Sequence, residues 1–145
     1  MSNQQSKNNN ILRVTLPIPP GINEQYATVN GHRVNTAIAR RFKQEVKKKL
    51  AALEREGVLH EKLRENLRQG FLSLLLEFYF ETPLKRDLDG GLKIAQDALC
   101  EGLGVNDNRV VNIHLLKYID PLHPHLDVEL EALDDWQFDE QYILL

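Results

Sequence analysis

The stretch FLSLLLEFYFETPLKRDLDGGLKIAQDALCEGLGVND, residues 71–107, decides the fold. Apolar side chains occupy every second position of 71–80, which predicts a buried central strand. From residue 92 the apolar positions recur three and four residues apart, which predicts a helix with Asp89 as its N-cap and a stop at the glycines of 102–104. A strand that leads through a polar loop into a helix is typical of a mixed α/β domain.

Three carboxylates flank this predicted helix, and they are Asp87, Asp89 and Asp107. Asp87 and Asp89 are two residues apart, so in an extended segment both side chains point to the same side. Lys93 is four residues after Asp89 and four before Asp97, so these three project from one side of the helix. Mg²⁺ prefers oxygen ligands and keeps waters that a substrate phosphate can replace. The pattern therefore predicts a magnesium site beside a lysine.

The same residues also have a purely structural interpretation. An aspartate at a helix N-terminus commonly caps free N–H groups, and Lys93 with Asp97 can form an exposed ion pair. An Asp-x-Asp pattern with a lysine does not by itself decide between a cap and a catalytic site. A calcium EF-hand is excluded, because the loop positions that require Gly and Glu, counted from Asp87, hold Leu92 and Ala98.

Length and composition indicate one soluble globular domain. The chain has 145 residues, without a long apolar run and without a signal-peptide pattern at its start. The single cysteine, Cys100, excludes an internal disulfide framework and suits a reducing compartment. We therefore expect a cytoplasmic protein with no membrane segment, in which Cys100 fills space in the helix.

Further elements are predicted on both sides of this centre. They are a strand at 11–16 ended by the prolines of 17–20, a hairpin that turns at Asn30-Gly31, a helix that Thr36 caps and that runs to about Glu56 with Gly57 as its stop, a short helix at 61–68, and strands at 109–119 and 126–133. The fold class is one small α/β (α+β) domain over residues 11–133, with a mixed sheet of about four strands flanked by two to three helices. We expect residues 1–10 to be disordered and residues 134–145 to form an acidic aromatic tail.

Charge is unevenly distributed along a chain whose net charge is −3. Residues 33–68 contain eleven Lys or Arg and five Glu, whereas residues 127–140 contain seven Asp or Glu and no Lys or Arg. The domain can therefore present a basic face that the net charge does not reveal, because the acidic tail offsets its positive charge. This basic face is either simply solvated or follows a phosphate backbone. The tail either packs back on the domain or binds a partner protein.

Several motifs resemble the RusA family of Holliday-junction resolvases, small endonucleases that cut four-way DNA junctions. LPIPPGINEQY at 16–26 is similar to the family's N-terminal strand, proline-rich turn and Asn-x-x-Tyr. RDLDGGLKIAQDAL at 86–99, followed by NDNRVV at 106–111, is similar to its core signature. The resemblance extends over about 11–133. It implies a RusA-like fold, a homodimer, and a Mg²⁺-dependent endodeoxyribonuclease, for which Mn²⁺ can substitute, that resolves Holliday junctions in DNA recombination and repair.

The resemblance also implies roles for individual residues. The family's catalytic set falls on Asp87, Asp89, Lys93 and Asp107, of which the three aspartates are metal ligands. Two positions depart from the family pattern: Gly90 stands where Asn usually follows the second aspartate, and Asn106 stands where the family often has the first of two aspartates. Asn106 offers a carbonyl oxygen but no charge, so this departure bears on metal binding.

DNA contacts are expected from basic residues near the predicted site and along the long helix. They are His32, Arg33, Lys47, Lys48, Lys85 and Arg86. The protein would then be a bacterial or phage-type cytoplasmic protein that joins the nucleoid when bound to DNA. Three other interpretations remain open at this level. They are a branched-DNA-binding relative without cleavage, a metal-dependent nuclease that acts on other DNA, and an adaptor that works through the tail at 134–145.

Overall fold

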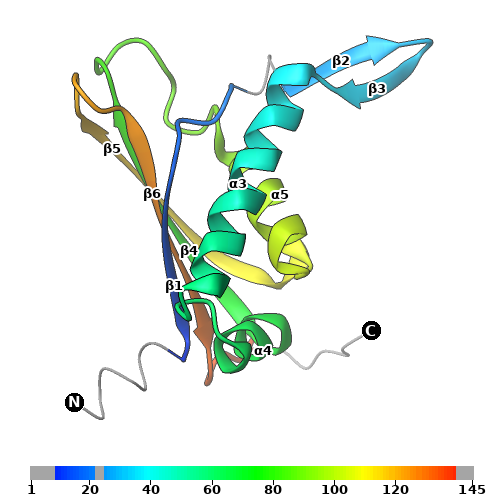
Figure 1. Ribbon diagram of the computed structural model, residues 1–145, viewed down its shortest axis with the longest axis vertical. Helices are drawn as coiled ribbons and strands as arrows, with labels where there is room; N and C mark the ends of the chain where they lie inside the picture. The colour runs from blue at the N-terminus through cyan, green and yellow to red at the C-terminus, as the bar shows by residue number, and fades with distance from the viewer. Residues whose placement is uncertain (1–8, 22–24, 140–145) are drawn as a thin grey trace.

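The computed structural model describes residues 9–21 and 25–139. Its elements in chain order are β1 (Ile11–Leu16), β2 (Tyr26–Val29), β3 (His32–Asn35), α3 (Ala37–Arg55), α4 (Glu61–Gln69), β4 (Phe71–Phe80), α5 (Leu92–Leu103), the 3-10 turn η1 (Asp107–Arg109), β5 (Val110–Ile119) and β6 (His125–Leu133). Four strands form one sheet in the order β1-β6-β4-β5, and β2 and β3 form a separate two-stranded sheet (Figure 1). The predicted mixed α/β class is confirmed.

Strand β4 lies in the middle of the sheet, as the alternation in 71–80 predicted. It pairs antiparallel with β6 and parallel with β5. Two neighbouring parallel strands need a crossover connection, because the carboxyl end of the first strand and the amino end of the second lie at opposite ends of the sheet. Helix α5 is that connection. The loop before α5 therefore lies at the carboxyl end of β4, and η1 lies at the amino end of β5.

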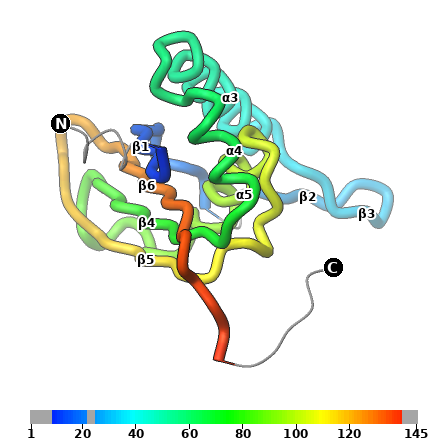
Figure 2. Tube along the Cα trace, turned by 90° about the horizontal axis from the view of Figure 1, so that it is seen from below, coloured from blue at the N-terminus to red at the C-terminus, as the bar shows by residue number. Residues whose placement is uncertain are grey.

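The core lies between one face of the sheet and the helices, which all pack on the same side (Figure 2). Every second residue of β4, from Leu72 to Phe80, is buried on this face, and α3 and α5 contribute the apolar residues opposite. The alternate residues of β4 lie on the uncovered face and are only half-buried. Burial on one face explains why the strand alternates instead of being apolar throughout.

Helix α3 begins and ends where local signals predict. The Thr36 hydroxyl accepts a hydrogen bond from the Ala39 N–H at 3.2 Å, which satisfies one of the free donors of the first turn. The helix ends at Arg55, and Gly57 follows with a φ of +79°. An ion pair of 3.0 Å between Lys43 and Glu101 joins α3 to α5 on the outside of their contact.

The β2–β3 hairpin projects from the amino end of α3, away from the sheet (Figure 1). Its turn residues Asn30 and Gly31 have φ values of +52° and +78°. Two consecutive positive φ angles define the tight turn whose twist matches antiparallel strands, and Asn-Gly adopts it at low cost. The predicted hairpin is therefore confirmed at its predicted position.

Both ends of the described chain are attached to the domain. The Asn66 side chain donates to the Asn9 carbonyl at 2.8 Å, and the Ala132 N–H donates to the Asn10 carbonyl at 2.7 Å. Asn9 and Asn10, which the sequence assigned to the disordered tail, are thus attached to the domain, and residues 1–8 of that tail lie outside the described residues. Phe138 packs edge-on against Phe71 with ring centroids 5.4 Å apart, so the tail packs back on the domain as far as it is described. Its last residues, 140–145, lie outside the description.

Candidate functional site

The start of α5 is determined by packing. The helix begins at Leu92, and its N-cap is Gly91, which makes no side-chain cap. A Cβ at Gly91 would lie 2.6 Å from Pro19 Cγ and 3.5 Å from Phe78 Cε1, so only glycine lets the chain pass between the proline-rich turn and β4. The prediction that Asp89 is the N-cap was wrong.

The Asp87–Asp89 segment is a pair of turns. The Gly90 N–H donates to the Asp87 carbonyl at 3.3 Å, and the Leu92 N–H donates to the Asp89 carbonyl at 3.2 Å. The prediction of an extended segment was therefore wrong, and the two-residue rule for strands does not apply to these side chains. Both aspartates are exposed at the amino end of α5, where the helix dipole favours negative charge.

Gly90 and Asn106 are the two departures from the RusA pattern, and each has a local structural setting. A Cβ at Gly90 would meet only the Asp87 carbonyl at 3.5 Å, an ordinary contact, so the backbone does not require glycine there. The Asn106 side-chain oxygen accepts from the Asn108 N–H at 3.1 Å and caps η1. That oxygen is engaged within its own turn.

Asp107 is the first residue of η1, beyond the carboxyl end of α5. Asp87 and Asp89 lie before the amino end of the same helix, whose 12 residues span roughly 18 Å at 1.5 Å per residue. Among residues 9–21 and 25–139, no three His, Cys, Asp or Glu side chains form a group that could hold a metal ion. The three predicted ligands are therefore not brought together within this single chain.

The donor chemistry at the amino end of α5 nonetheless fits a hard cation in part. Asp87 and Asp89 are two exposed carboxylates with no sulfur or imidazole neighbour in the sequence between residues 85 and 95. Mg²⁺ is commonly held by one or two carboxylates together with waters and substrate phosphate oxygens. The pair thus suits Mg²⁺ in ligand type and in its access to solvent, whereas Asp107 is not part of that pair.

Lys93 lies in the first turn of α5 with its side chain half-exposed. Its Nζ is 3.5 Å from Asp97 Oδ2, one turn further along the helix. The neighbouring Asp97 charge and then Tyr26 raise the pKa of Lys93, so the side chain is a cation across the physiological range. Lys93 and Asp97 lie on the same side of α5, as expected. Asp89 does not share that side, because it lies before the first residue of the helix.

A hollow of about 440 Å³ lies at the carboxyl end of the same helix. Its lining includes Asp97, Glu101, Asn106, Asp107 and the buried Cys100. Burial, followed by the charges of the nearby carboxylates, raises the pKa of Cys100 to about 11. The thiol is therefore protonated at neutral pH and fills space in the helix, as the sequence predicted.

The basic residues expected to contact DNA have different environments. His32, Arg33, Lys47 and Lys48 are exposed on the hairpin and α3, and Lys85 is exposed in an ion pair of 3.1 Å with Glu81. Arg86 differs, because it is half-buried and donates to the Pro19 carbonyl at 2.8 Å. This arginine secures the proline-rich turn against the loop that carries the aspartates.

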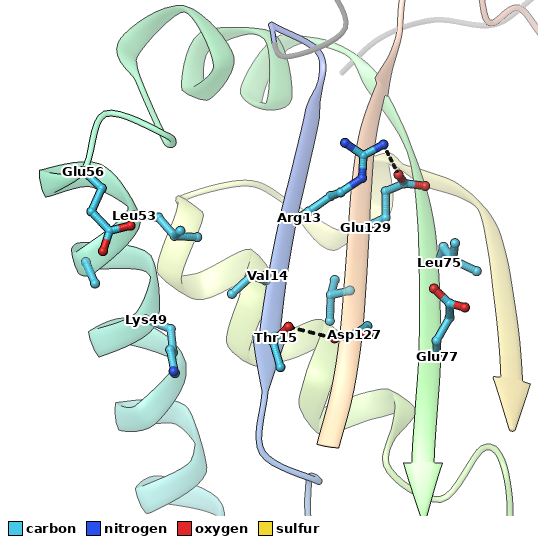
Figure 3. Close-up of a pocket in the computed structure, with 12 residues that line it drawn as sticks. Arg13, Val14, Thr15, Lys49, Leu53, Glu56, Leu75, Glu77, Asp127 and Glu129 are labelled. Carbon is cyan, nitrogen blue, oxygen red and sulfur yellow. Dashed lines mark hydrogen bonds and ion pairs between the residues drawn. The ribbon is translucent and has the colours of Figure 1, made fainter. Parts of the chain in front are cut away.

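A larger hollow, about 570 Å³, lies elsewhere, around the edge strand β1, and residues of α3 and of the uncovered sheet face line it (Figure 3). Four of its polar residues form two pairs: Arg13 with Glu129 at 2.8 Å, and Thr15 with Asp127 at 2.7 Å. It contains none of the predicted catalytic residues. We therefore place the candidate site at α5, where the exposed Asp87 and Asp89 and the lysine of the motif lie.

Gln25 is a site residue that the sequence did not indicate. Its side chain is completely buried, and its amide donates to Asp97 Oδ2 at 3.3 Å. The two residues are 72 positions apart, so no local pattern could have connected them.

No protein-family model matches the chain, and no curated protein matches it. Among the described residues, no helix is long and apolar enough to cross a membrane.

Proposed function

We propose that this chain is a Mg²⁺-dependent, structure-specific endonuclease that resolves Holliday junctions by paired phosphodiester hydrolysis. The observation that carries the proposal is the amino end of α5. There an exposed Asp87–Asp89 pair lies in the turns just before α5, and a half-exposed Lys93 lies in its first turn. The helix starts at a position between Pro19 and Phe78 where only glycine fits. Site residues held by a strand, a packed turn and a helix are positioned more precisely than residues on a free loop.

The chemistry of phosphodiester hydrolysis matches these side chains. The reaction needs an activated water and stabilisation of the negative charge that develops on the phosphate. Mg²⁺, when bound, supplies both. Asp87 and Asp89 would hold the ion, and the Lys93 ammonium, a compact point charge, would stabilise the developing charge. Asp107 could be a ligand of the same ion only if it came from a second copy of the chain or if the chain rearranged. The homodimer that the resemblance implies would supply such a second copy.

Charge segregation supports a nucleic-acid substrate. The exposed basic side chains of α3 lie on the helix layer, and the hairpin with His32 and Arg33 extends from the amino end of this helix (Figure 1). The acidic side chains of β6, Asp127 and Glu129, line the hollow on the uncovered sheet face. A phosphate backbone would thus approach the helix layer, and the net charge of −3 conceals this asymmetry.

The test is cleavage of a labelled synthetic four-way junction in Mg²⁺ by the native chain, Asp89→Asn and Asp135→Asn. Asp135 is an exposed aspartate in the tail, so its variant removes the same charge away from α5. We expect paired nicks with the native chain and Asp135→Asn and none with Asp89→Asn. Equal cleavage of a linear duplex would indicate a nuclease for other DNA, and cleavage by Asp89→Asn would remove the aspartate pair from the proposal.

A second candidate is a non-catalytic relative that binds branched DNA. Two observations favour it: the three aspartates are separated within the chain, and the Asn106 oxygen is used as a cap. This candidate predicts that the native chain and Asp89→Asn bind the junction equally and that neither cuts it.

A further inference from the structure

Asp97 is held more firmly than a surface ion-pair partner needs to be. Its side chain is 18% exposed, whereas that of Lys93 is 49% exposed. The carboxylate is therefore the fixed member of the pair, and the ammonium is the member that reaches into solvent. An ordinary helix ion pair has two exposed partners, as in Lys48 with Glu45, where the values are 76% and 51%.

The fixed position of Asp97 comes from Gln25, which packs beneath it. Gln25 is fully buried, its Nε2 donates to Asp97 Oδ2 at 3.3 Å, and its Oε1 has no partner among the described residues. Burying an amide with an unsatisfied oxygen costs free energy that an apolar side chain of the same size would not. The amide is therefore better explained by its contact with Asp97 than by its packing.

The neighbouring residue extends this contact to Lys93 and to the hairpin. Tyr26 lies close enough to Lys93 to raise the pKa of its ammonium, and the Arg33 guanidinium lies 4.0 Å from the Tyr26 ring centroid. The Gln25 carbonyl accepts from the Thr36 N–H at 3.0 Å, at the start of α3. Lys93 is thus paired with Asp97 on its own helix and lies near Tyr26 on β2, the first strand of the hairpin.

We propose that Asp97 is a positioning residue that fixes the Lys93 ammonium for phosphodiester cleavage, with Gln25 orienting the Asp97 carboxylate. The inference rests on the proposed nuclease function. A point charge stabilises a developing charge only at short distance and in a defined place, so a lysine on four flexible carbons needs a fixed partner. In this arrangement Asp97 touches neither the substrate nor the metal, and it acts through Lys93.

The test is a double-mutant cycle in single-turnover junction cleavage, with Asp97→Asn, Lys93→Met and the combined variant. Asn retains an oxygen for the Gln25 amide and removes only the charge. We expect Asp97→Asn to cleave about 10- to 100-fold more slowly, the range for groups that orient a site residue, with unchanged junction affinity. In the Lys93→Met background it should cause no further loss, because the group through which it acts is already absent.

Glu101→Gln is the matched control. Glu101 lies on α5 one turn beyond Asp97, and this change removes the charge that pairs with Lys43 of α3 at 3.0 Å. It should leave the cleavage rate unchanged. Should Asp97→Asn fail to fold, Gln25→Met removes the amide with Asp97 intact, and its slower cleavage should likewise disappear in the Lys93→Met background.

The outcomes separate this inference from the function on which it rests. If the native chain cleaves the junction and the Asp97→Asn variant cleaves it at the same rate, the positioning role alone is overturned. An additional loss in the Lys93→Met background also overturns it, because Asp97 would then act by another route. A native chain that cuts no junction overturns the nuclease proposal, and the positioning role is then rejected with it.

Discussion

Gly91→Ala tests whether packing against the proline-rich turn sets the start of the site helix. The added Cβ would lie 2.6 Å from Pro19 Cγ, a distance that real Cβ contacts do not reach. The proline ring is fused to the backbone and cannot rotate away, so the loop or the start of α5 must shift. Overpacking of this kind costs about 1–3 kcal/mol. The φ of −103° at Gly91 suits alanine, so the cost is purely steric.

Gly90→Ala is the control for this experiment. It changes the adjacent residue in the same way, and its Cβ would meet only the Asp87 carbonyl at 3.5 Å. Replacing glycine by alanine stiffens the unfolded chain equally in both variants, so this contribution cancels in the comparison. Urea unfolding should therefore show that Gly91→Ala is less stable than Gly90→Ala by about 1–3 kcal/mol. In thermal unfolding, the midpoint of Gly91→Ala should be lower by roughly 2–4 °C for each kcal/mol.

Equal unfolding midpoints for Gly91→Ala and Gly90→Ala would show that a Cβ at Gly91 does not clash with Pro19. The glycine would then tolerate a side chain, and the proline-rich turn would not position α5. A loss of junction cleavage by Gly91→Ala without any loss of stability would also contradict the steric account, because the clash must cost folding free energy before it can displace Lys93.

Two further predictions concern the basic helix and the buried thiol. Lys47→Ala combined with Lys48→Ala should weaken junction binding and reduce the slope of log affinity against log salt concentration by about one to two. Lys49 lines the hollow of about 570 Å³ around β1, so Lys49→Ala should change neither the affinity nor the slope. Equal effects of these variants in a gel-shift series would contradict a DNA-binding face on α3. The pKa of Cys100 is raised from 9.0 to about 11, so the unfolded chain loses this proton first, and the unfolding free energy should fall as pH rises from about 9 to about 11. In Cys100→Ala this fall should be smaller, as measured by urea unfolding at each pH.

Local rules were sufficient for most of the elements. The alternation in 71–80, the Thr36 cap and the Asn30-Gly31 turn each depend on neighbours in the chain, and each is confirmed. The strand predicted at 109–119 begins one residue later, at Val110, because the residues before it form η1. Such signals are reliable where periodicity or a backbone angle restricts the choice of residue.

The start of the site helix could not be predicted in the same way. Asp89 has the sequence signature of an N-cap, yet the helix begins three residues later. The Pro19 ring and Phe78 occupy the space beside Gly91, and they come from segments separated from it by 72 and 13 residues. Contact with distant segments outweighed a local capping preference of about 1 kcal/mol.

The sequence by itself determined which chemical groups the protein carries and which elements carry them: an aspartate pair and a lysine at the start of a helix, a third aspartate after it, and a basic helix and hairpin. How these groups lie relative to one another depends on the tertiary structure. Asp107 lies beyond the carboxyl end of α5 and the Asp87–Asp89 pair before its amino end, and Gln25 packs against Asp97. The physical reason is that periodicity describes one element at a time, whereas the spacing of groups on different elements depends on how their buried faces pack.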